Sequence, residues 1–428
     1  MKDNVRNKKR IVVLGSGYGG LYTFTKLHKH FVRGRASNNS NKDVSLLLIS
    51  RTNYFVSTPL LHEVATGSIS PEHVTEPLRK ILACKEEEFV LTEVTGLSLK
   101  TKEVNTMRGP VPYDYLVVAL GSQTAYRNTP GAPEYTITLK TLPDAIKMKN
   151  HFINTFERAS GIADPAELRE ALTFIVVGGG ATGVELVAEM AEMFLDTFTR
   201  YYSKRVMQAV ELILIHGGDE LLQTFGRSIR VRSKNVLRRK GINIKLGVRV
   251  LEVRPKELVL DNGEVIRAGT IIWAAGVEPS LLTTDVPIER ESGRIVVNEY
   301  LQVPSFPEVF VLGDMAAFHS KGSGQALPML AQVAHKESLG VAGNIINLVE
   351  GRRPKVYVYK HWGDLVSLGE WMAAGELYGF KIFGHMAWFF WRGVYLSKLL
   401  SFSKKSKVLL DWIVEIFRPR DISSFSNK

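Results

Sequence analysis

Three glycines at one spacing occur in each of two segments, at Gly15, Gly17 and Gly20 and again at Gly178, Gly180 and Gly183. In a G-x-G-x-x-G segment the first glycine makes a tight turn, and the second lets the backbone approach a pyrophosphate. The third lets the following helix pack against the strand. One such match is weak, because glycine-rich turns between strands and helices are common. Two matches in one chain predict two dinucleotides, one held tightly and one exchanged, which indicates a flavin and a nicotinamide nucleotide.

Each glycine segment stands between a predicted strand and a predicted helix. Residues 11–14 and 174–177 are apolar and mostly β-branched, as in strands buried on both faces of a parallel sheet. The helix after each turn directs its N-terminal N–H groups at the phosphates. An acidic residue normally ends the next strand and binds the ribose hydroxyls. Here Ser50 and His216 stand at those positions, so Ser50 offers a hydroxyl without charge and His216 leaves NADH and NADPH both open.

Further candidate contacts follow later in the chain. Gly121 closes a strand in a turn where the backbone can pass close to the flavin nucleotide, and Gly276 lies in the turn that closes the second unit. Asp314 ends another strand, where its carboxylate can accept hydrogen bonds from sugar-like hydroxyls. Residues 328–337 open a helix whose N-terminus can stabilise negative charge on the flavin ring.

Length, charge and cysteine content limit the function. The 428 residues predict two or three domains. The net charge of +12 favours binding to anionic partners, and the alternative is a basic, soluble surface that binds no particular partner. Cys84 is the only cysteine, which excludes a disulfide framework, a Cys-rich metal site and a dithiol redox centre. Disulfide reductases and typical sulfide:quinone oxidoreductases therefore lose plausibility. His, Asp and Glu show no metal-ligand spacing, and we expect no metal and no nucleic-acid partner.

The termini and connections give further expectations. Ten polar, basic residues precede the first strand and no apolar run reaches about 18 residues, so we expect a cytosolic protein without a transmembrane helix. Residues 34–43 read as a polar loop, and residues 53–70 as a loop leading to a helix with Ser70 as cap and Pro71 at its first position. Residues 89–118 read as a meander of short strands, and residues 144–169 as a helical connector.

The last part of the chain changes in composition. Residues 380–400 are rich in aromatic side chains, and residues 408–417 predict a second helix with Asp411 and Glu415 on one face and apolar residues around the rest. Between these segments lie Lys404, Lys405 and Lys407. Two short amphipathic helices with tryptophan on one side and lysine nearby predict an in-plane anchor on an anionic membrane. A helical hairpin that buries its aromatic residues in a dimer interface is the alternative, and both can hold together.

On these residues the chain resembles, along essentially its whole length, the type II NADH:quinone oxidoreductases, which are single-subunit respiratory dehydrogenases that do not pump protons. The motifs that carry the resemblance are GSGYGG at 15–20, NYFVSTPLLHEVATG at 53–67, YDYLVVALGS at 113–122, VVGGGATGVELVAEM at 176–190, WAAGV at 273–277, VLGDMA at 311–316, AQVAHKE at 331–337, and WRGVYLSKL and LLDWIVEIFRPRDI near the end. The glycine motifs are shared by many flavoproteins. The AQxA helix and the WRGVYLSK segment are more specific.

The resemblance implies roles for individual residues. It places FAD at the first three glycines and Asp314, and the nicotinamide nucleotide at the second three glycines and Glu185. It also implies that Ala331 and Gln332 lie beside the isoalloxazine ring where the quinone arrives. Glu185 is the candidate for positioning the nicotinamide or relaying a proton, with a helix-capping carboxylate as the alternative. Lys336 and Glu337 stand where the family commonly carries glutamine, so the resemblance leaves the polar lining of the quinone pocket open.

We therefore expect an α/β protein with two Rossmann-like domains, one for FAD and one for NAD, plus a C-terminal amphipathic helical region that anchors it to the membrane. The expected limits are 8–145 and 291–350 for the FAD-binding domain, 170–290 for the NAD(P)H-binding domain, and 351–428 for membrane association and dimerisation. The expected activity is hydride transfer from NADH, with NADPH possible, to FAD and on to a membrane quinone. The expected place is the cytoplasmic side of the cell membrane, as a peripheral homodimer. Alternatives are a sulfide:quinone oxidoreductase, another NAD(P)H-dependent flavin reductase or a non-catalytic nucleotide sensor.

Overall fold

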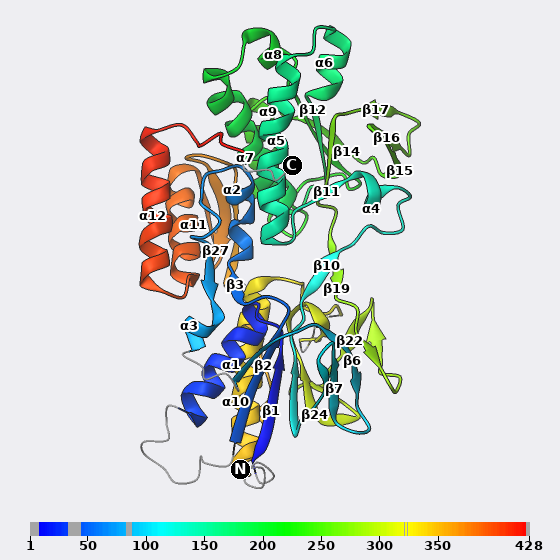
Figure 1. The fold of residues 1–428 in the computed structure, drawn as a ribbon, viewed down its shortest axis with the longest axis vertical. Helices are drawn as coiled ribbons and strands as arrows, with labels where there is room; N and C mark the ends of the chain where they lie inside the picture. Colours follow the sequence, from blue (N-terminus) through cyan, green and yellow to red (C-terminus); the bar gives the residue numbers. More distant parts are fainter. Residues whose placement is uncertain (1–7, 33–43, 83–87, 321, 323, 425–428) are drawn as a thin grey trace. The chain divides into compact units, whose positions relative to one another are not determined.

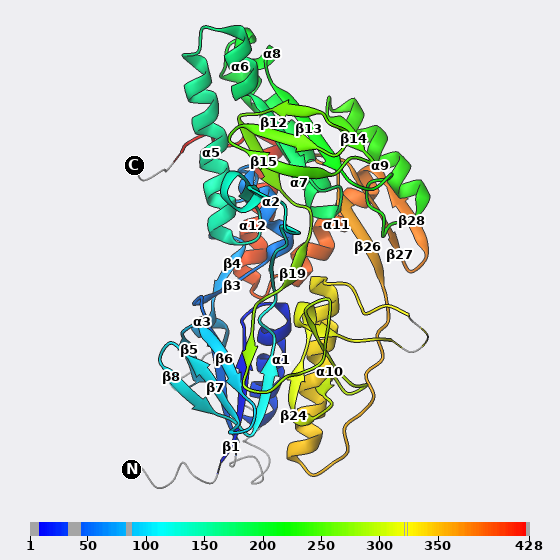
Figure 2. The same ribbon diagram turned by 90° about the vertical axis from the view of Figure 1, so that its right-hand side faces the viewer.

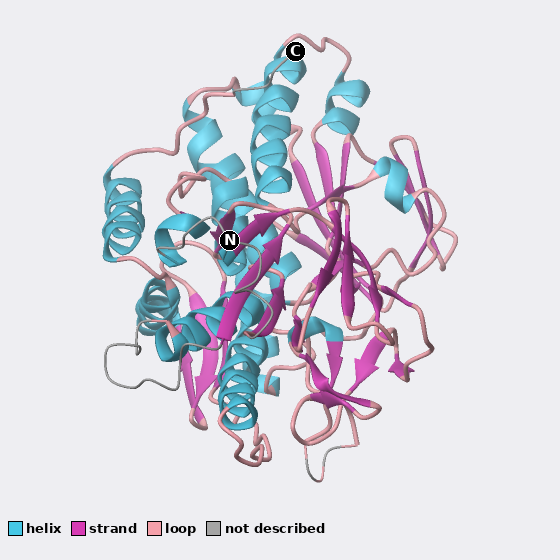
Figure 3. Ribbon diagram, turned by 60° about the horizontal axis from the view of Figure 1, so that its bottom comes forward, coloured by secondary structure: helices cyan, strands magenta, loops and turns pink. Residues whose placement is uncertain are grey.

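The chain folds into two units, each assembled from three separate stretches of sequence. The computed structural model describes residues 8–32, 44–82, 88–320, 322 and 324–424. The first unit contains residues 1–56, 76–123 and 277–360, and the second contains residues 57–75, 124–276 and 361–428. In Figure 3 the strands of both units are drawn in magenta and the helices beside them in cyan.

A six-stranded sheet forms the centre of the first unit. Its strand order is β23-β24-β9-β1-β2-β5, with β1 parallel to both β2 and β9. The helices α1 (Tyr18–Phe31) and α10 (Ala331–Val349) pack against each other beside this sheet (Figure 1). The apolar run after Arg10 is fully buried, because β1 has a neighbour on each side and a helix over it. The strands are β1 (Lys9–Leu14), β2 (Val44–Ser50), β5 (Phe89–Leu91), β9 (Tyr115–Val118), β23 (Gln302–Val303) and β24 (Phe306–Val311).

Smaller elements complete the first unit. The expected meander is confirmed, because β6, β7 and β8 are successive antiparallel strands, while the flanking β5 and β9 join the parallel sheet. The 3-10 helix η7 (Gly313–Met315) follows β24. The remaining elements are β3 (Tyr54–Val56), α3 (Leu78–Leu82), β6 (Val94–Ser98), β7 (Glu103–Thr106), β8 (Gly109–Pro112), β19 (Val277–Pro279), β20 (Thr283–Thr284), β21 (Arg290–Glu291), β22 (Arg294–Val296) and β25 (Ala316–Ala317).

The second unit is built on a five-stranded parallel sheet with the order β11-β18-β12-β13-β14. Its helix α5 (Leu142–Ser160) begins with a capping box between Thr141 and Asp144, which satisfies N–H groups at the helix start. The strands are β11 (Ile137–Thr138), β12 (Thr173–Val177), β13 (Glu211–His216), β14 (Asn243–Leu246) and β18 (Thr270–Trp273), and the other helices are α4 (Ala132–Tyr135), α6 (Pro165–Ala171), α7 (Ala181–Glu192), α8 (Lys204–Gln208) and α9 (Arg227–Arg239). The π-helix η5 (Met193–Thr197) and the 3-10 helix η6 (Phe198–Arg200) extend α7. An antiparallel sheet contains β15 (Val250–Arg254), β16 (Glu257–Leu260) and β17 (Val265–Arg267).

The C-terminal stretch belongs to the second unit. An antiparallel sheet of β26, β27 and β28 leads into α11 and α12, and α11 packs on that sheet (Figure 2). The bounds are β26 (Gly363–Ser367), β27 (Ala373–Leu377), β28 (Phe380–Phe383), α11 (Gly384–Lys398) and α12 (Phe402–Phe417), with η3 (Thr58–Leu60) and α2 (Leu61–Ala65) from the earlier stretch. The strands β4 (Thr75–Pro77) and β10 (Ser122–Thr124) lie where the chain passes from one unit to the other.

Several local expectations are wrong. Ser70 and Pro71 begin no helix, because the backbone N–H of Ser70 and the ring of His73 bond to the Asp411 carboxylate, and the chain turns there into β4. The helix of this stretch is α2, within the expected loop. Residues 380–383 form β28, and the lysines expected between two helices lie inside α12, whose N-cap is Ser401.

The unit boundaries also differ from the expected domain limits. Residues 57–75 group with the second unit, the chain re-enters the first unit at residue 277, and residues 361–428 join the second unit. The physical reason is that α2 packs on α5 and α7, and β26 packs on α7. Cys84 and the expected loop 34–43 lie outside the described residues.

Candidate functional site

The glycine turn of the first unit has the geometry that its spacing predicts. Gly15 has a φ of +96°, its N–H donates to the Ile49 carbonyl at 2.8 Å, and a Cβ there would lie 2.3 Å from the Ala119 carbonyl oxygen. A Cβ on Gly20 would lie 1.9 Å from the carbonyl oxygen of Gly15, whereas a Cβ on Gly17 would meet nothing within 4 Å. The first and third glycines are thus required by backbone packing, and Gly17 faces open space at the N-terminus of α1.

The corresponding turn of the second unit repeats this arrangement. Gly178 has a φ of +124°, and a Cβ there would lie 2.2 Å from the Ala274 carbonyl oxygen. A Cβ on Gly183 would lie 1.9 Å from the Gly178 carbonyl oxygen, and a Cβ on Gly180 would again meet nothing within 4 Å. Neither α1 nor α7 carries an acidic residue in its first turn, so both helix N-termini can accept a negative charge.

Ser50 ends β2 beside the first glycine turn. Its hydroxyl is 2.8 Å from the hydroxyl of Ser16 and accepts a hydrogen bond from the Thr52 N–H at 3.2 Å. These neighbours fix the hydroxyl and leave it capacity for one further hydrogen bond. The structure thus places the Ser50 hydroxyl beside Ser16 of the first glycine turn.

Asp314, Gly121 and the start of α10 belong to the same unit as the first glycine turn. The Ser122 hydroxyl donates to the Asp314 carboxylate, which orients that carboxylate. Gly121 has a φ of +73°, and a Cβ there would meet nothing within 4 Å. Ala331 and Gln332 are the first two residues of α10, whose first turn contains no acidic residue. Ser122 was not predicted as a site residue, although the turn that contains it was.

Glu337 occupies a different environment from the one expected for the quinone pocket. Its side chain is 0% exposed, its Oε2 accepts a hydrogen bond from the Gly313 N–H at 2.5 Å, and its Oε1 has no partner among the described residues. Burial raises the pKa of the carboxyl from 4.5 to about 8. Glu337 thus joins α10 to the turn that carries Asp314. Lys336 points elsewhere, because its amine donates to the Lys360 carbonyl and lies 5.1 Å from the ring centre of Tyr359.

His216 and Gly276 flank the second glycine turn. Nδ1 of His216 accepts a hydrogen bond from the Gly179 N–H at 3.2 Å, and burial lowers the pKa of the ring. Gly276 has a φ of +131°, and a Cβ there would lie 3.3 Å from Nη2 of Arg127. The Nε–H of Arg127 donates to the Ala275 carbonyl at 3.3 Å. Arg127 is therefore a neighbour of this site that sequence reasoning missed.

Glu185 projects from α7 toward β26. Its Oε1 accepts a hydrogen bond from the Ser367 N–H at 3.1 Å, and burial raises the pKa of its carboxyl to about 8. This pKa keeps the carboxyl largely protonated near neutral pH. Glu185 is the fifth residue of α7 and bonds to Ser367 of β26, so it does not cap the helix.

A cluster of buried charged residues surrounds Glu185 in the second unit. Glu189 and Glu192 follow Glu185 on one face of α7, and both accept hydrogen bonds from Arg420. Glu63 accepts a hydrogen bond from the Trp412 indole at 2.8 Å, and burial raises its carboxyl pKa to about 8. The spacing of the three glutamates of α7 is the sequence signal that could have predicted one acidic face. Their partners, which come from distant segments, left no such signal.

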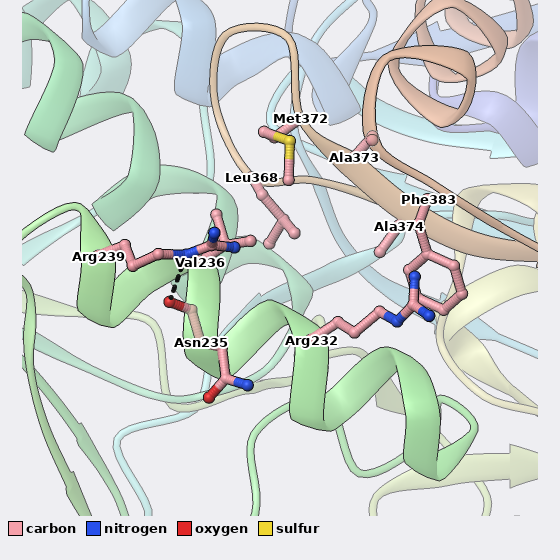
Figure 4. A pocket seen from close by; sticks show the side chains of 10 residues that line it. Arg232, Asn235, Val236, Arg239, Leu368, Met372, Ala373, Ala374 and Phe383 are labelled. Carbon is pink, nitrogen blue, oxygen red and sulfur yellow. Dashed lines mark hydrogen bonds between the residues drawn. The ribbon is translucent and has the colours of Figure 1, made fainter.

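A cavity of about 400 Å³ lies elsewhere in the second unit, between α9 and the β26–β28 sheet (Figure 4). The guanidinium of Arg232 lies 4.2 Å from the ring centre of Phe383, and the side chains of Leu368 and Met372 provide apolar surface. None of the residues predicted as functional lines this cavity.

The comparisons with known proteins concern nearly the whole chain. Residues 9–338 match the family described as Pyridine nucleotide-disulphide oxidoreductase, and residues 361–421 match the NDH2 C-terminal domain. The chain is 30% identical over 431 residues to the type II NADH:quinone oxidoreductase Ndh of Mycobacterium tuberculosis, covering 96% of this chain and 89% of that protein.

Two solved structures share the fold. NDH2 from Plasmodium falciparum, in complex with NADH, matches with a TM-score of 0.87 and 22% identity, covering 97% of this chain and all of that one. The sulfide:quinone oxidoreductase from Aquifex aeolicus matches with a TM-score of 0.73 and 19% identity, covering 96% of this chain and 95% of that one. The expected fold class is confirmed.

Proposed function

The chain belongs to the family of type II NADH:quinone oxidoreductases, and we propose from this premise that its first unit binds FAD and its second unit binds NADH. The enzyme oxidises NADH and reduces a quinone without pumping protons. The observation that supports one nucleotide in each unit is the pair of glycine turns. In each turn the middle glycine, Gly17 or Gly180, faces open space, while the first and third glycines pack on backbone atoms. FAD, when bound, accepts the hydride of NADH and passes two electrons to the quinone.

The residues present in the first unit fit FAD. A Cβ on Gly17 would intrude into the space in front of the α1 N-terminus, where a pyrophosphate is stabilised by N–H groups. Ser50 supplies a hydroxyl for the ribose, and Asp314, oriented by Ser122, supplies a carboxylate for sugar-like hydroxyls. Ala331 and Gln332 at the uncapped start of α10 are proposed to lie beside the flavin ring on the side that the quinone reaches.

The second unit orients NADH in the same way. The α7 N-terminus and the open space at Gly180 accept the pyrophosphate, and His216 and Gly276 contact the remainder of the nucleotide. Glu185 is proposed to hold a proton on Oε2, because Oε1 accepts the Ser367 N–H and burial keeps the carboxyl protonated near pH 7. A quinone takes up two protons with its two electrons, so a protonated carboxyl is a chemically suitable source.

The exposed face of α12 supports attachment to a membrane surface. Asp411 and Glu415 point into the unit, where they bond to His73 and to Arg392 and Arg420. The outward face is therefore apolar, with exposed side chains at Leu409, Leu410, Ile413, Val414, Ile416 and Phe417. The N-terminal turns of the same helix contain Lys404, Lys405 and Lys407. We infer that α12 lies in the plane of an anionic bilayer, with its apolar face in the lipid.

The tryptophans do not form the anchoring face. Trp388, Trp391 and Trp412 are buried, and the guanidinium of Arg392 lies 3.8 Å from the ring centre of Trp388 and 4.6 Å from that of Trp412. The expected aromatic platform is thus mostly interior, and Phe389 and Phe390 of α11 remain exposed. Among the described helices, none combines the length and apolarity needed to cross a bilayer. We propose a peripheral protein on the cytoplasmic side of the membrane, and a homodimer whose existence analytical ultracentrifugation in detergent would test.

The proposed reaction is tested with the purified protein in mild detergent. Anaerobic mixing with NADH should bleach the flavin absorbance, and a short-chain quinone should restore it. Glu185→Gln keeps an acceptor for the Ser367 N–H and removes the proton, so it should slow the return of absorbance while bleaching by NADH proceeds. Absence of bleaching despite bound FAD would contradict the proposed function. An unchanged rate of recovery in the variant would contradict only the role of Glu185.

A further inference from the structure

The strand β13 ends at His216, whereas a nucleotide-binding domain of this kind normally has an acidic residue at that position. Because Nδ1 of His216 accepts the Gly179 N–H, the neutral ring carries its proton on Nε2. That Nε2 atom is buried and has no partner among the described residues. An acid here would accept hydrogen bonds from the ribose and repel a 2′-phosphate, and His216 does neither.

Arg249 is held beside this strand end by the backbone. The Val248 N–H donates to the His216 carbonyl at 3.4 Å, and the Gly247 N–H donates to the Gly218 carbonyl at 3.0 Å. The Arg249 N–H donates to the Asp261 carboxylate at 3.0 Å, and the Asp261 N–H donates back to the Arg249 carbonyl at 2.9 Å. These bonds fix the backbone from which the Arg249 side chain extends.

The Arg249 side chain crosses the residue next to His216. Its Cγ lies 3.0 Å and its Nε 3.7 Å from the point that a Cβ on Gly217 would occupy. Within the described part of the chain, its exposed guanidinium forms no ion pair. The side chain of Arg249, a cation without a carboxylate partner among the described residues, thus lies against Gly217, the residue that follows the end of β13.

Two acids follow His216 within four residues along the chain. Glu220 is bound to Arg230 at 2.5 Å, which neutralises it. Asp219 lies three residues beyond His216, with Oδ1 3.4 Å from the point that a Cβ on Gly247 would occupy. Asp219 thus lies beside the segment that leads into Arg249, and its charge opposes a phosphate here.

We propose that His216 and Arg249 form a subsite for a 2′-phosphate, so that the enzyme oxidises NADPH as well as NADH. This inference rests on the proposed function of the second unit. A guanidinium binds phosphate through several donors, and the neutral ring of His216 sets no negative charge against the phosphate. The reaction is otherwise unchanged: NADPH gives up a hydride and leaves as NADP+, and the quinone takes up two electrons and two protons.

The test measures the ratio of kcat/KM for NADPH to kcat/KM for NADH in the purified holoenzyme. Loss of a charge-assisted hydrogen bond lowers binding by about 10- to 100-fold, so Arg249→Met and His216→Glu should each lower the ratio by about that factor. Arg249→Lys keeps the positive charge and should give a ratio between those of Arg249→Met and the wild type. Asp219→Asn should raise the ratio. The control is Arg254→Met, which removes the same charge from an exposed pair with Glu252 and should leave the ratio unchanged.

A binding measurement gives an answer independent of turnover. By titration calorimetry, adenosine 2′,5′-bisphosphate should bind the wild-type holoenzyme more tightly than AMP, and Arg249→Met should abolish the difference. Oxidation of NADH without oxidation of NADPH would overturn the inference and leave the proposed function standing, whereas oxidation of neither would overturn both. Equal losses in Arg249→Met and Arg254→Met would also overturn it, because they would show an effect of net charge alone.

Discussion

The guanidinium of Arg420 lies 2.8 Å from Oε2 of Glu189, and the two side chains are only 5% and 6% exposed. The same guanidinium is 3.2 Å from Glu192 and 2.9 Å from Glu415. One buried cation therefore serves three carboxylates, two from α7 and one from α12. It joins the segment after α12 to the helix that begins at the second glycine turn.

Removing this cation should destabilise the second unit. Loss of one partner from a buried ion pair costs about 3–5 kcal/mol, because the remaining charges stay buried without compensation. We expect Arg420→Met to lower the urea midpoint of the fluorescence transition, since Trp388, Trp391 and Trp412 are buried in this unit. Arg418→Met, at an exposed position two residues earlier, is the matched control. Equal midpoints for the two variants would show that the buried cluster does not hold the C-terminal segment.

The buried carboxyl of Glu337 should make stability depend on pH. Its pKa is about 8 in the folded protein and 4.5 when exposed, so between these values the folded state binds the additional proton. Stability therefore decreases as the pH rises from about 4.5 to 8, by at most about 1.4 kcal/mol per pH unit from this group. Glu337→Gln keeps an acceptor for the Gly313 N–H and does not ionise. Thermal melting at pH 5 to 8 should show a smaller decline in the variant, and parallel declines would contradict the assignment.

Two alanine substitutions in one turn should have opposite consequences. Gly20→Ala places a Cβ 1.9 Å from the Gly15 carbonyl oxygen, so it should destabilise the first unit by about 1–3 kcal/mol or more. Gly17→Ala meets no protein atom within 4 Å and should leave the melting temperature of the FAD-free protein unchanged. It should weaken FAD binding at least about tenfold, because the methyl group enters the space proposed for the pyrophosphate. Reconstitution of the stripped protein with FAD measures this, and wild-type affinity in Gly17→Ala would place the pyrophosphate elsewhere.

A charge on the outer face of α12 should weaken membrane binding. Val414 is 53% exposed on this face, and Val265 of β17 is 50% exposed elsewhere in the same unit. Val414→Glu should lower binding to vesicles of phosphatidylglycerol and phosphatidylcholine by about tenfold or more, since each methylene buried in lipid contributes about 0.8 kcal/mol. Val265→Glu makes the same change of charge and should have little effect. Co-sedimentation distinguishes the two. Identical binding of both variants would favour a second copy of the chain as the cover of this face.

The sequence by itself determined both glycine turns and the strands and helices beside them. Their roles follow from local backbone sterics, because a positive φ at Gly15 or Gly178 and a close approach at Gly20 or Gly183 depend on residues near in sequence or on the adjacent strand. Ser50 and His216 were located for the same reason, since each ends a strand whose apolar run is continuous.

Only the tertiary structure decided which way charged and apolar side chains face. The pattern of α12 shows an amphipathic helix, but the burial of its acidic face follows from His73, Arg392 and Arg420. Glu337 is buried, and the N–H of Gly313, 24 residues earlier in the sequence, compensates its carboxyl group with a hydrogen bond. Burial and ion pairing depend on contacts between distant segments, and no local spacing encodes them.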